Sequence, residues 1–215
     1  MPDINLVILL AVLTVGISMY AWSNDALMQS WTMRPYAIAR DSRQWYRFLT
    51  SGFLHADWGH LLFNMLAFYS FGDVVLNVLQ YKFGPPMGSA AFLLLYLGGI
   101  VVSDLPTYFR HRDDRHYTSL GASGGVASII FAAVLYAPTL GIGFPLLPSL
   151  SIPGFIWGAL YLAYSWYMGR QQGDNINHDA HLYGALFGFA LMLVLMPSAG
   201  PSFINQINLY IQSKI

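Results

Sequence analysis

The sequence lacks cysteine altogether among its 215 residues. Disulfides, thiolate-bound metals and cysteine nucleophiles are therefore excluded, and cysteine usage says nothing about the redox compartment. Charge is also scarce, because Asp, Glu, Lys and Arg together make up 9% of the chain, whereas soluble domains carry roughly 25%. The formal net charge is zero and no long basic run occurs, so nothing points to a nucleic-acid partner.

Apolar residues, by contrast, make up 56% of the chain and gather in six segments. A transmembrane helix needs about 20 apolar residues to cross the hydrocarbon core of a bilayer. We therefore expect an all-α, polytopic membrane protein, with residues 1–215 forming a single six-helix membrane domain. The expected spans cover residues 4–22, 58–79, 87–103, 120–136, 152–168 and 180–196.

Two of these spans and the C-terminal tail need comment. The first segment lacks a basic n-region and a small-residue cleavage site, so we interpret it as a helix rather than a signal peptide. The fourth is short and is followed by several prolines and glycines, so we expect the other helices to surround it. The tail over 198–215 carries isoleucines at helical spacing, which fits a short interfacial helix and a frayed terminus about equally well.

Polar residues occur near the starts of three of the spans. His60 and Asn64 begin the second, Ser123 begins the fourth and His181 begins the sixth. If the helices alternate in direction, these three begin at the same surface, and the four side chains share one depth. Ionisable side chains in membrane spans are costly and mark function by default.

Each residue also has an ordinary explanation. Serine between glycines usually lets membrane helices pack closely. Asn64 is suited to a hydrogen bond between helices, and His60 to the wet interface. We favour the functional interpretation because the four side chains occur together at matched depth.

Their chemistry fits nucleophilic catalysis. A serine hydroxyl needs an adjacent base, and His181 is the candidate base for Ser123. Developing oxyanion charge needs donors. The unpaired backbone N–H groups at the start of the Ser123 helix provide some, and Asn64 and His60, four residues apart on one helix face, can complete the site.

The histidine span adds further detail. Asp179 lies two residues before His181 and points to a different side of a helix, so we predict a Ser-His dyad rather than a triad. His178 could share the face of His181, although an exposed loop histidine is the favoured interpretation. Gly184 and Gly188 are spaced to let this helix approach Ser123 and Gly124 closely.

Together these motifs resemble the rhomboid family of intramembrane serine proteases. The motifs that carry the resemblance are Gly121-Ala122-Ser123-Gly124, His60-xxx-Asn64 and Ala180-His181-xx-Gly184-xxx-Gly188. The stretch from Trp45 to His55 is also similar to the family's loop before the second helix. Each motif is weak alone, but their order over residues 45–196 is specific.

The resemblance implies a role for each matched residue. Ser123 would be the nucleophile and His181 the general base and then acid. Oxyanion donors would be Asn64, His60 and the backbone N–H of Ser123, and the structural residues near the site would be Gly121, Gly124, Gly184 and Gly188. The resemblance also implies transmembrane protein substrates in a lipid bilayer, no metal or organic cofactor, and a multi-pass protein of a bacterial inner membrane.

Two points depart from a simple match. Many family members carry an aromatic residue one turn after the serine, which packs on the catalytic histidine, but this chain has Ala127. The orientation of the His181 ring must therefore come from elsewhere. Eight arginines also fall on the catalytic face, which by the positive-inside rule would be cytoplasmic. We nevertheless expect the family's outward orientation, because the rule weakens for loops that fold, such as residues 23–57.

Other functions fit less well. A small transporter would show discontinuous helices lining a path across the midplane, whereas these polar residues gather near one surface. A non-proteolytic rhomboid-like binder of transmembrane clients shares the fold, but such relatives lack the serine or the histidine. The charged run over residues 111–116 is expected to be a solvated loop rather than a metal or substrate site.

Overall fold

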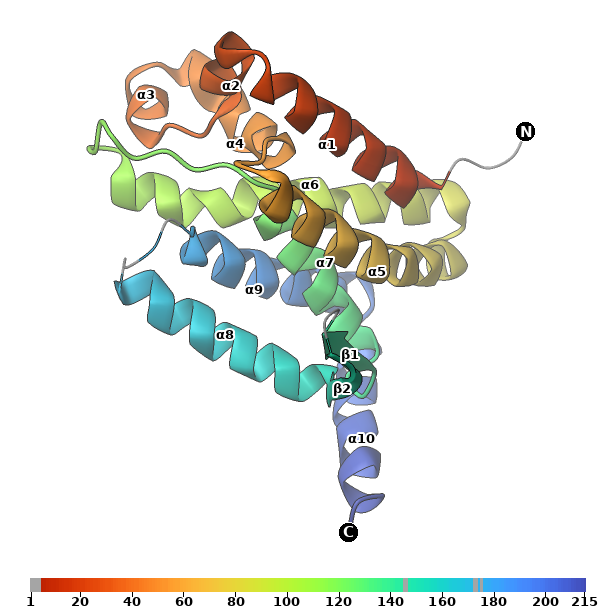
Figure 1. Cartoon of the computed structure of the whole chain (residues 1–215). Helices are drawn as coiled ribbons and strands as arrows, with labels where there is room; N and C mark the ends of the chain where they lie inside the picture. Colours follow the sequence, from red (N-terminus) through yellow and green to blue (C-terminus); the bar gives the residue numbers. More distant parts are fainter. Residues whose placement is uncertain (1–4, 145–146, 172–173, 175) are drawn as a thin grey trace.

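Helices account for most of the computed structural model, which describes residues 5–144, 147–171, 174 and 176–215 (Figure 1). An apolar helix lies over each segment where one is expected. These helices are α1 (Leu6–Trp22), α5 (Trp58–Phe83), α6 (Pro85–His111), α7 (Ser123–Tyr136), α8 (Gly154–Gln171) and α9 (His178–Leu195). The largest difference is in α6, which continues past the expected end at residue 103, through Pro106, to His111.

Length and composition separate these helices. Within the described residues, α5, α6 and α9 are long and apolar enough to cross a membrane. The apolar helices α1 and α7 are shorter. The structure therefore supports a membrane protein with at least three spans, and the count of six stays a prediction.

The segment between α1 and α5 folds into short helices. They are α2 (Asp25–Trp31), α3 (Pro35–Arg40), η1 (Ser42–Tyr46), α4 (Arg47–Thr50) and η2 (Ser51–Phe53). Met33, Ile38 and Phe48 form a small core of their own. The buried Arg47 guanidinium donates to the carbonyls of Gln29 and Thr32 at 2.8 and 2.7 Å. This segment is therefore a folded unit rather than an irregular loop.

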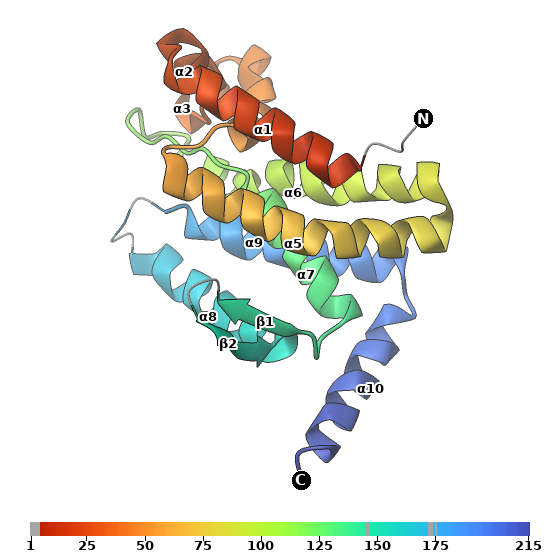
Figure 2. The same ribbon diagram turned by 45° about the vertical axis from the view of Figure 1, so that its right-hand side comes forward.

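A β-hairpin between α7 and α8 departs from the all-α expectation. Strands β1 (Gly141–Phe144) and β2 (Leu147–Pro153) pair antiparallel (Figure 2). Ile142 pairs with Ile152, and β-branched residues favour strands. The prolines and glycines of this stretch correctly indicate the end of α7 but do not by themselves predict pairing.

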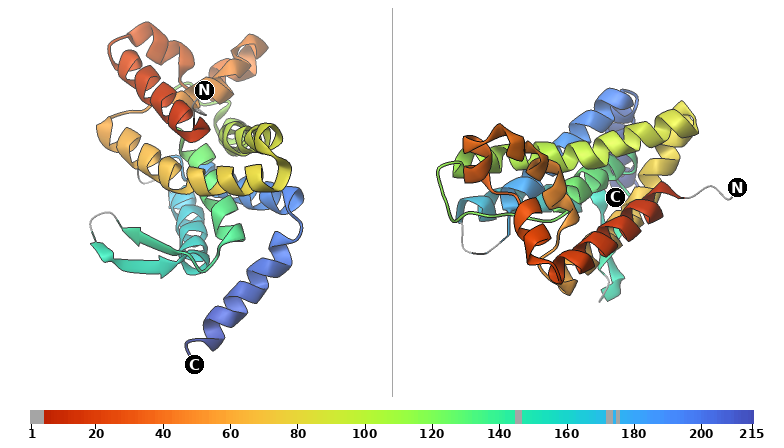
Figure 3. Two further views of the ribbon diagram at one scale, coloured as in Figure 1. Left: turned by 90° about the vertical axis from the view of Figure 1, so that its right-hand side faces the viewer. Right: turned by 90° about the horizontal axis from the view of Figure 1, so that it is seen from above.

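Helix α7 occupies the middle of the bundle, between α5, α6 and α9 (Figures 1 and 3). Every residue from Gly124 to Leu135 is buried. Ser123 is half-buried and Tyr136 is exposed. As the short length predicts, the other helices surround α7, and it is open only at its two ends.

The C-terminal tail forms α10 (Ala199–Gln212). In Figure 1 this helix runs across the direction of α5, α6 and α9 and extends away from them. Phe203 packs edge-on against Phe189 with ring centroids 5.7 Å apart. Ile204 and Ile211 are exposed. The tail is therefore helical rather than frayed, and an interfacial position remains a prediction.

Candidate active site

The starts of α5, α7 and α9 meet at one end of the bundle. His60 lies in the first turn of α5, where Asp57 accepts a hydrogen bond from its backbone N–H at 2.8 Å. The His60 imidazole packs on Gly121, where a Cβ would lie 2.8 Å from Nε2. A Cβ on Gly124 would lie 3.4 Å from the carbonyl oxygen of Ala180 in α9. His60, Ser123 and His181 thus belong to three helix ends in contact.

Gly121 shapes the approach to Ser123. Its φ of +127° is a backbone conformation that side-chain-bearing residues rarely adopt. Its N–H donates to the carbonyl of Ser51 at 3.0 Å, and the Ser51 hydroxyl donates to the buried carboxyl of Asp104 at 3.4 Å. The turn before the serine is therefore held from the folded segment and from α6.

Helices α7 and α9 touch backbone to backbone. A Cβ on Gly184 would overlap the carbonyl of Gly124, and a Cβ on Gly188 would overlap the carbonyl of Ser128. Only glycine allows so close an approach at these two positions. Because Gly124 follows Ser123 and Gly184 is one turn after His181, this contact brings the two candidate catalytic segments together.

Asn177 anchors the start of α9. Its side-chain oxygen accepts from the backbone N–H of Ala180 and from the hydroxyl of Thr107 in α6, both at 3.0 Å. Its amide donates to the Ser119 hydroxyl at 3.1 Å. Ser119 in turn pairs with Met33 through two backbone hydrogen bonds. Our sequence interpretation missed Asn177, although asparagine before a helix is a typical N-cap.

Asp179 is not placed to act as the carboxylate of a conventional triad. The Asp179 carboxylate forms an ion pair with Arg110 of α6, and Arg110 also donates to the carbonyl of Gly169 in α8 at 3.3 Å.

The interpretation of His178 as an exposed loop residue is wrong, because it is buried in the first turn of α9. Its Nε2 lies 3.1 Å from Asp174, and this hydrogen bond lowers the pKa of the Asp174 carboxyl.

His60, Ser123 and His181 are half-buried, whereas Asn64 is buried. Among the described residues, no hydrogen bond joins the Ser123 hydroxyl to His181. Catalytic hydrogen bonds are often long before substrate binds. Asn64 donates one amide hydrogen to the carbonyl of His60 at 2.9 Å. Since a side-chain amide has two N–H donors, the other is available for an oxyanion.

An aromatic residue that sequence interpretation missed lies beside the candidate base. The ring of Tyr161 in α8 is nearly parallel to that of His181, with centroids 6.1 Å apart. The sequence offers no signal for this contact, because nothing in the spacing of α8 shows which residue faces α9.

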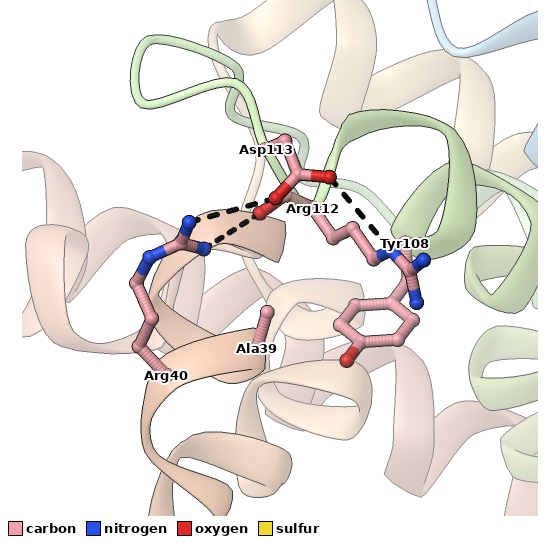
Figure 4. Close-up of a pocket in the computed structure, with 5 residues that line it drawn as sticks. All are labelled: Ala39, Arg40, Tyr108, Arg112 and Asp113. Atoms are coloured by element: carbon pink, nitrogen blue, oxygen red, sulfur yellow. Dashed lines mark hydrogen bonds and ion pairs between the residues drawn. The ribbon is translucent and has the colours of Figure 1, made fainter.

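Two residues of the charged run over residues 111–116 line a cavity elsewhere in the protein. A cavity of about 400 Å³ lies among Ala39, Arg40, Tyr108, Arg112 and Asp113 (Figure 4). Arg40 donates to the carbonyl of Arg112 at 2.9 Å and pairs with Asp113. None of the candidate catalytic residues lines it. Within the described part of the chain, no cluster of three or more His, Asp or Glu side chains is placed to hold a metal.

Comparison of the sequence with known proteins identifies its family. The profile of the Rhomboid domain matches residues 42–198, which is most of the chain. The chain belongs to the rhomboid family. This rhomboid is 30% identical over 163 residues to YdcA of Bacillus subtilis (strain 168), a match that covers 74% of this chain and 72% of YdcA.

Two further relatives are longer proteins. Over 146 residues the rhomboid is 32% identical to presenilin-associated rhomboid-like protein A, mitochondrial, of Danio rerio, with 64% of this chain and 34% of that protein covered. Over 166 residues it is 28% identical to rhomboid protease GluP of B. subtilis, with 73% and 27% covered. The chain therefore spans about a third or less of these two relatives.

Proposed function

We propose that this rhomboid is a serine endopeptidase with six membrane-spanning helices, which cleaves transmembrane segments of other proteins through Ser123 and His181. The observation that carries the proposal is the meeting of the starts of α5, α7 and α9, closed by the contact of Gly184 with Gly124. Relatives named as rhomboid proteases support the reaction class.

The proposed reaction has two stages. The Ser123 hydroxyl attacks the substrate carbonyl while His181 takes its proton, and the oxyanion is met by the Ser123 backbone N–H, the free Asn64 amide N–H and His60. His181 then gives the proton to the leaving amine as the peptide C–N bond breaks. A water, activated by His181, hydrolyses the acyl-serine ester and restores the enzyme.

Cleavage of a model transmembrane substrate by the purified protein tests this function. We expect Ser123→Ala and His181→Ala to abolish cleavage. Ser70→Ala and His116→Ala are matched controls, because both residues are exposed, and they should cleave like wild type. A fluorophosphonate probe should label wild type but neither active-site variant. Cleavage by Ser123→Ala at the wild-type rate, or an inert wild type, contradicts the proposal.

We also propose that the site opens to the outer side of a bacterial inner membrane. The absence of native cysteine makes single-cysteine variants straightforward to interpret. In intact cells, an impermeant thiol reagent should label a cysteine at Arg112, on the site's face, and leave one at Lys82, at the end of α5, unlabelled. The reverse pattern would place the site at the cytoplasmic surface.

A further inference from the structure

The imidazole of His181 lies between two other rings. Tyr161 of α8 is inclined by only 21° to it, with centroids 6.1 Å apart. His178, one turn earlier in α9, meets it edge-on, with centroids 5.8 Å apart and planes at 77°. Both separations fall in the range where aromatic rings attract each other. The two rings therefore restrict the orientations that the His181 imidazole can adopt.

Tyr161 is itself held in place. Trp157, one turn earlier on α8, stacks on it with centroids 4.9 Å apart and planes at 23°. The buried Phe131 of α7 packs on it at 5.6 Å. Gly158, the residue after Trp157, also faces this ring, because a Cβ there would be in van der Waals contact with Phe131 at 3.4 Å. Three helices thus contribute to a connected aromatic group that reaches the candidate base.

Helix α7 provides no ring one turn after Ser123. That position is Ala127, a buried residue whose side chain is a single methyl group. The next aromatic residue along α7 is Phe131, which packs on Tyr161. The flat face presented to His181 therefore comes from α8.

We propose that Tyr161 is a positioning residue that holds the His181 imidazole in the orientation from which one ring nitrogen reaches the Ser123 hydroxyl. This inference rests on the proposed protease function. The flat ring, rather than the hydroxyl, performs the role, because the contact is a parallel stack. Loss of the ring leaves the imidazole free to rotate away from the nucleophile, which slows the chemical step and leaves substrate binding largely unchanged.

Substitutions at Tyr161 in the full-length protein test the proposal. We expect Tyr161→Leu to lower kcat about tenfold and to change KM less than about twofold, in keeping with the strength of one aromatic contact. Tyr161→Phe keeps the ring and should retain most of the wild-type kcat. Tyr167→Leu is the matched control, because Tyr167 is an exposed tyrosine on the same helix, and it should behave like wild type.

A second measurement reports how well His181 activates Ser123. The rate of fluorophosphonate labelling of Ser123 against pH should fall at every pH in Tyr161→Leu and stay near wild type in Tyr161→Phe. Thermal unfolding in detergent identifies variants that fail to fold. If Tyr161→Leu fails, Tyr161→Met, which keeps an unbranched apolar side chain, should be folded and show the same loss of kcat.

Four results would overturn the inference. They are a wild-type kcat in folded Tyr161→Leu or Tyr161→Met, an equal loss in Tyr161→Phe, an equal loss in Tyr167→Leu, and a change confined to KM. The protease function stands or fails separately, on the comparison of wild type with Ser123→Ala. An active wild type with an unaffected Tyr161→Leu variant would reject the positioning role alone.

Discussion

Gly184 of α9 lies directly against the carbonyl group of Gly124 in α7, the residue that follows Ser123. The separation of these two helices is therefore set by backbone atoms rather than by side chains. Side chains can change rotamer to relieve a clash, whereas two helical backbones can only move apart. The distance between the candidate nucleophile and base is consequently sensitive to a single methyl group.

We predict that Gly184→Ala lowers both stability and activity. The added methyl group overlaps the Gly124 carbonyl, and overpacking of this kind typically costs about 1–3 kcal/mol. Gly16→Ala in α1 is the matched control, because a Cβ there meets no atom within 4 Å. Thermal unfolding in detergent and substrate cleavage measure the two effects. Equal melting temperatures and equal activities for the two variants would show that α7 and α9 are not in close contact.

Asn64→Ala should lower kcat by roughly 10²–10³, the usual loss for one oxyanion donor. KM should change little, because the donor acts on charge that develops during the reaction. Asn77→Ala serves as control, since Asn77 lies further along α5 and donates to Asp73. Steady-state cleavage kinetics give both constants. A loss that appears only in KM would assign Asn64 to substrate binding.

Asp179→Asn should reduce activity by less than about tenfold, because Asp179 pairs with Arg110 rather than orienting His181. Loss of the carboxylate from a catalytic triad costs about 10⁴ in kcat. Arg110→Gln should produce a similar, small reduction, and the double variant should add little to either. Cleavage rates of the two single variants and the double variant provide the measurement. A loss near 10⁴ in Asp179→Asn alone would restore the triad.

His55 should make stability fall at acidic pH. It is buried in the loop before α5 and bonded to Ser18 at 2.9 Å. Burial, reinforced by nearby His60, lowers the pKa of the His55 imidazole to about 3. Since the unfolded chain takes up this proton near pH 6.5 and the folded chain does not, stability is full above that pH. It is lost as the pH falls, by up to about 1.4 kcal/mol per unit.

The His55→Asn variant tests this pH effect. The Ser18 hydroxyl donates its only proton to the carbonyl of Phe53, so His55 donates to Ser18 through Nδ1. An asparagine amide can replace that donor without titrating. The decrease in melting temperature between pH 7 and pH 5 should therefore be smaller in His55→Asn than in wild type. An unchanged decrease would mean that His55 is protonated in the folded protein.

The helices and their relative directions were predictable from the sequence, because long apolar runs have few alternatives in a membrane. Alternation of helix direction also predicted that the starts of α5, α7 and α9 lie at one end of the bundle, where the structure has them. Helix ends were less predictable, as α6 shows. Its polar C-terminal part over residues 104–111 lacks the apolar pattern of a span, but it is held as helix by contacts such as that of Thr107 with Asn177.

Contacts between distant segments were the part that the sequence could not supply. The burial of His178 depends on Tyr164 and Asp174, and the parallel stack on His181 depends on how α8 leans toward α9. The hairpin between α7 and α8 was hidden for a related reason. Its short strands gain stability by pairing with each other, which local composition does not reveal.

The short length of α7 has a consequence for where substrates would be cut. Its 14 residues rise about 21 Å, less than the ~30 Å thickness of the hydrocarbon core. Because α5, α6 and α9 surround this helix, a nucleophile at its first residue would keep a fixed level relative to them. The depth of a bond below the membrane surface, set by the position of α7, would then determine whether that bond is cleaved.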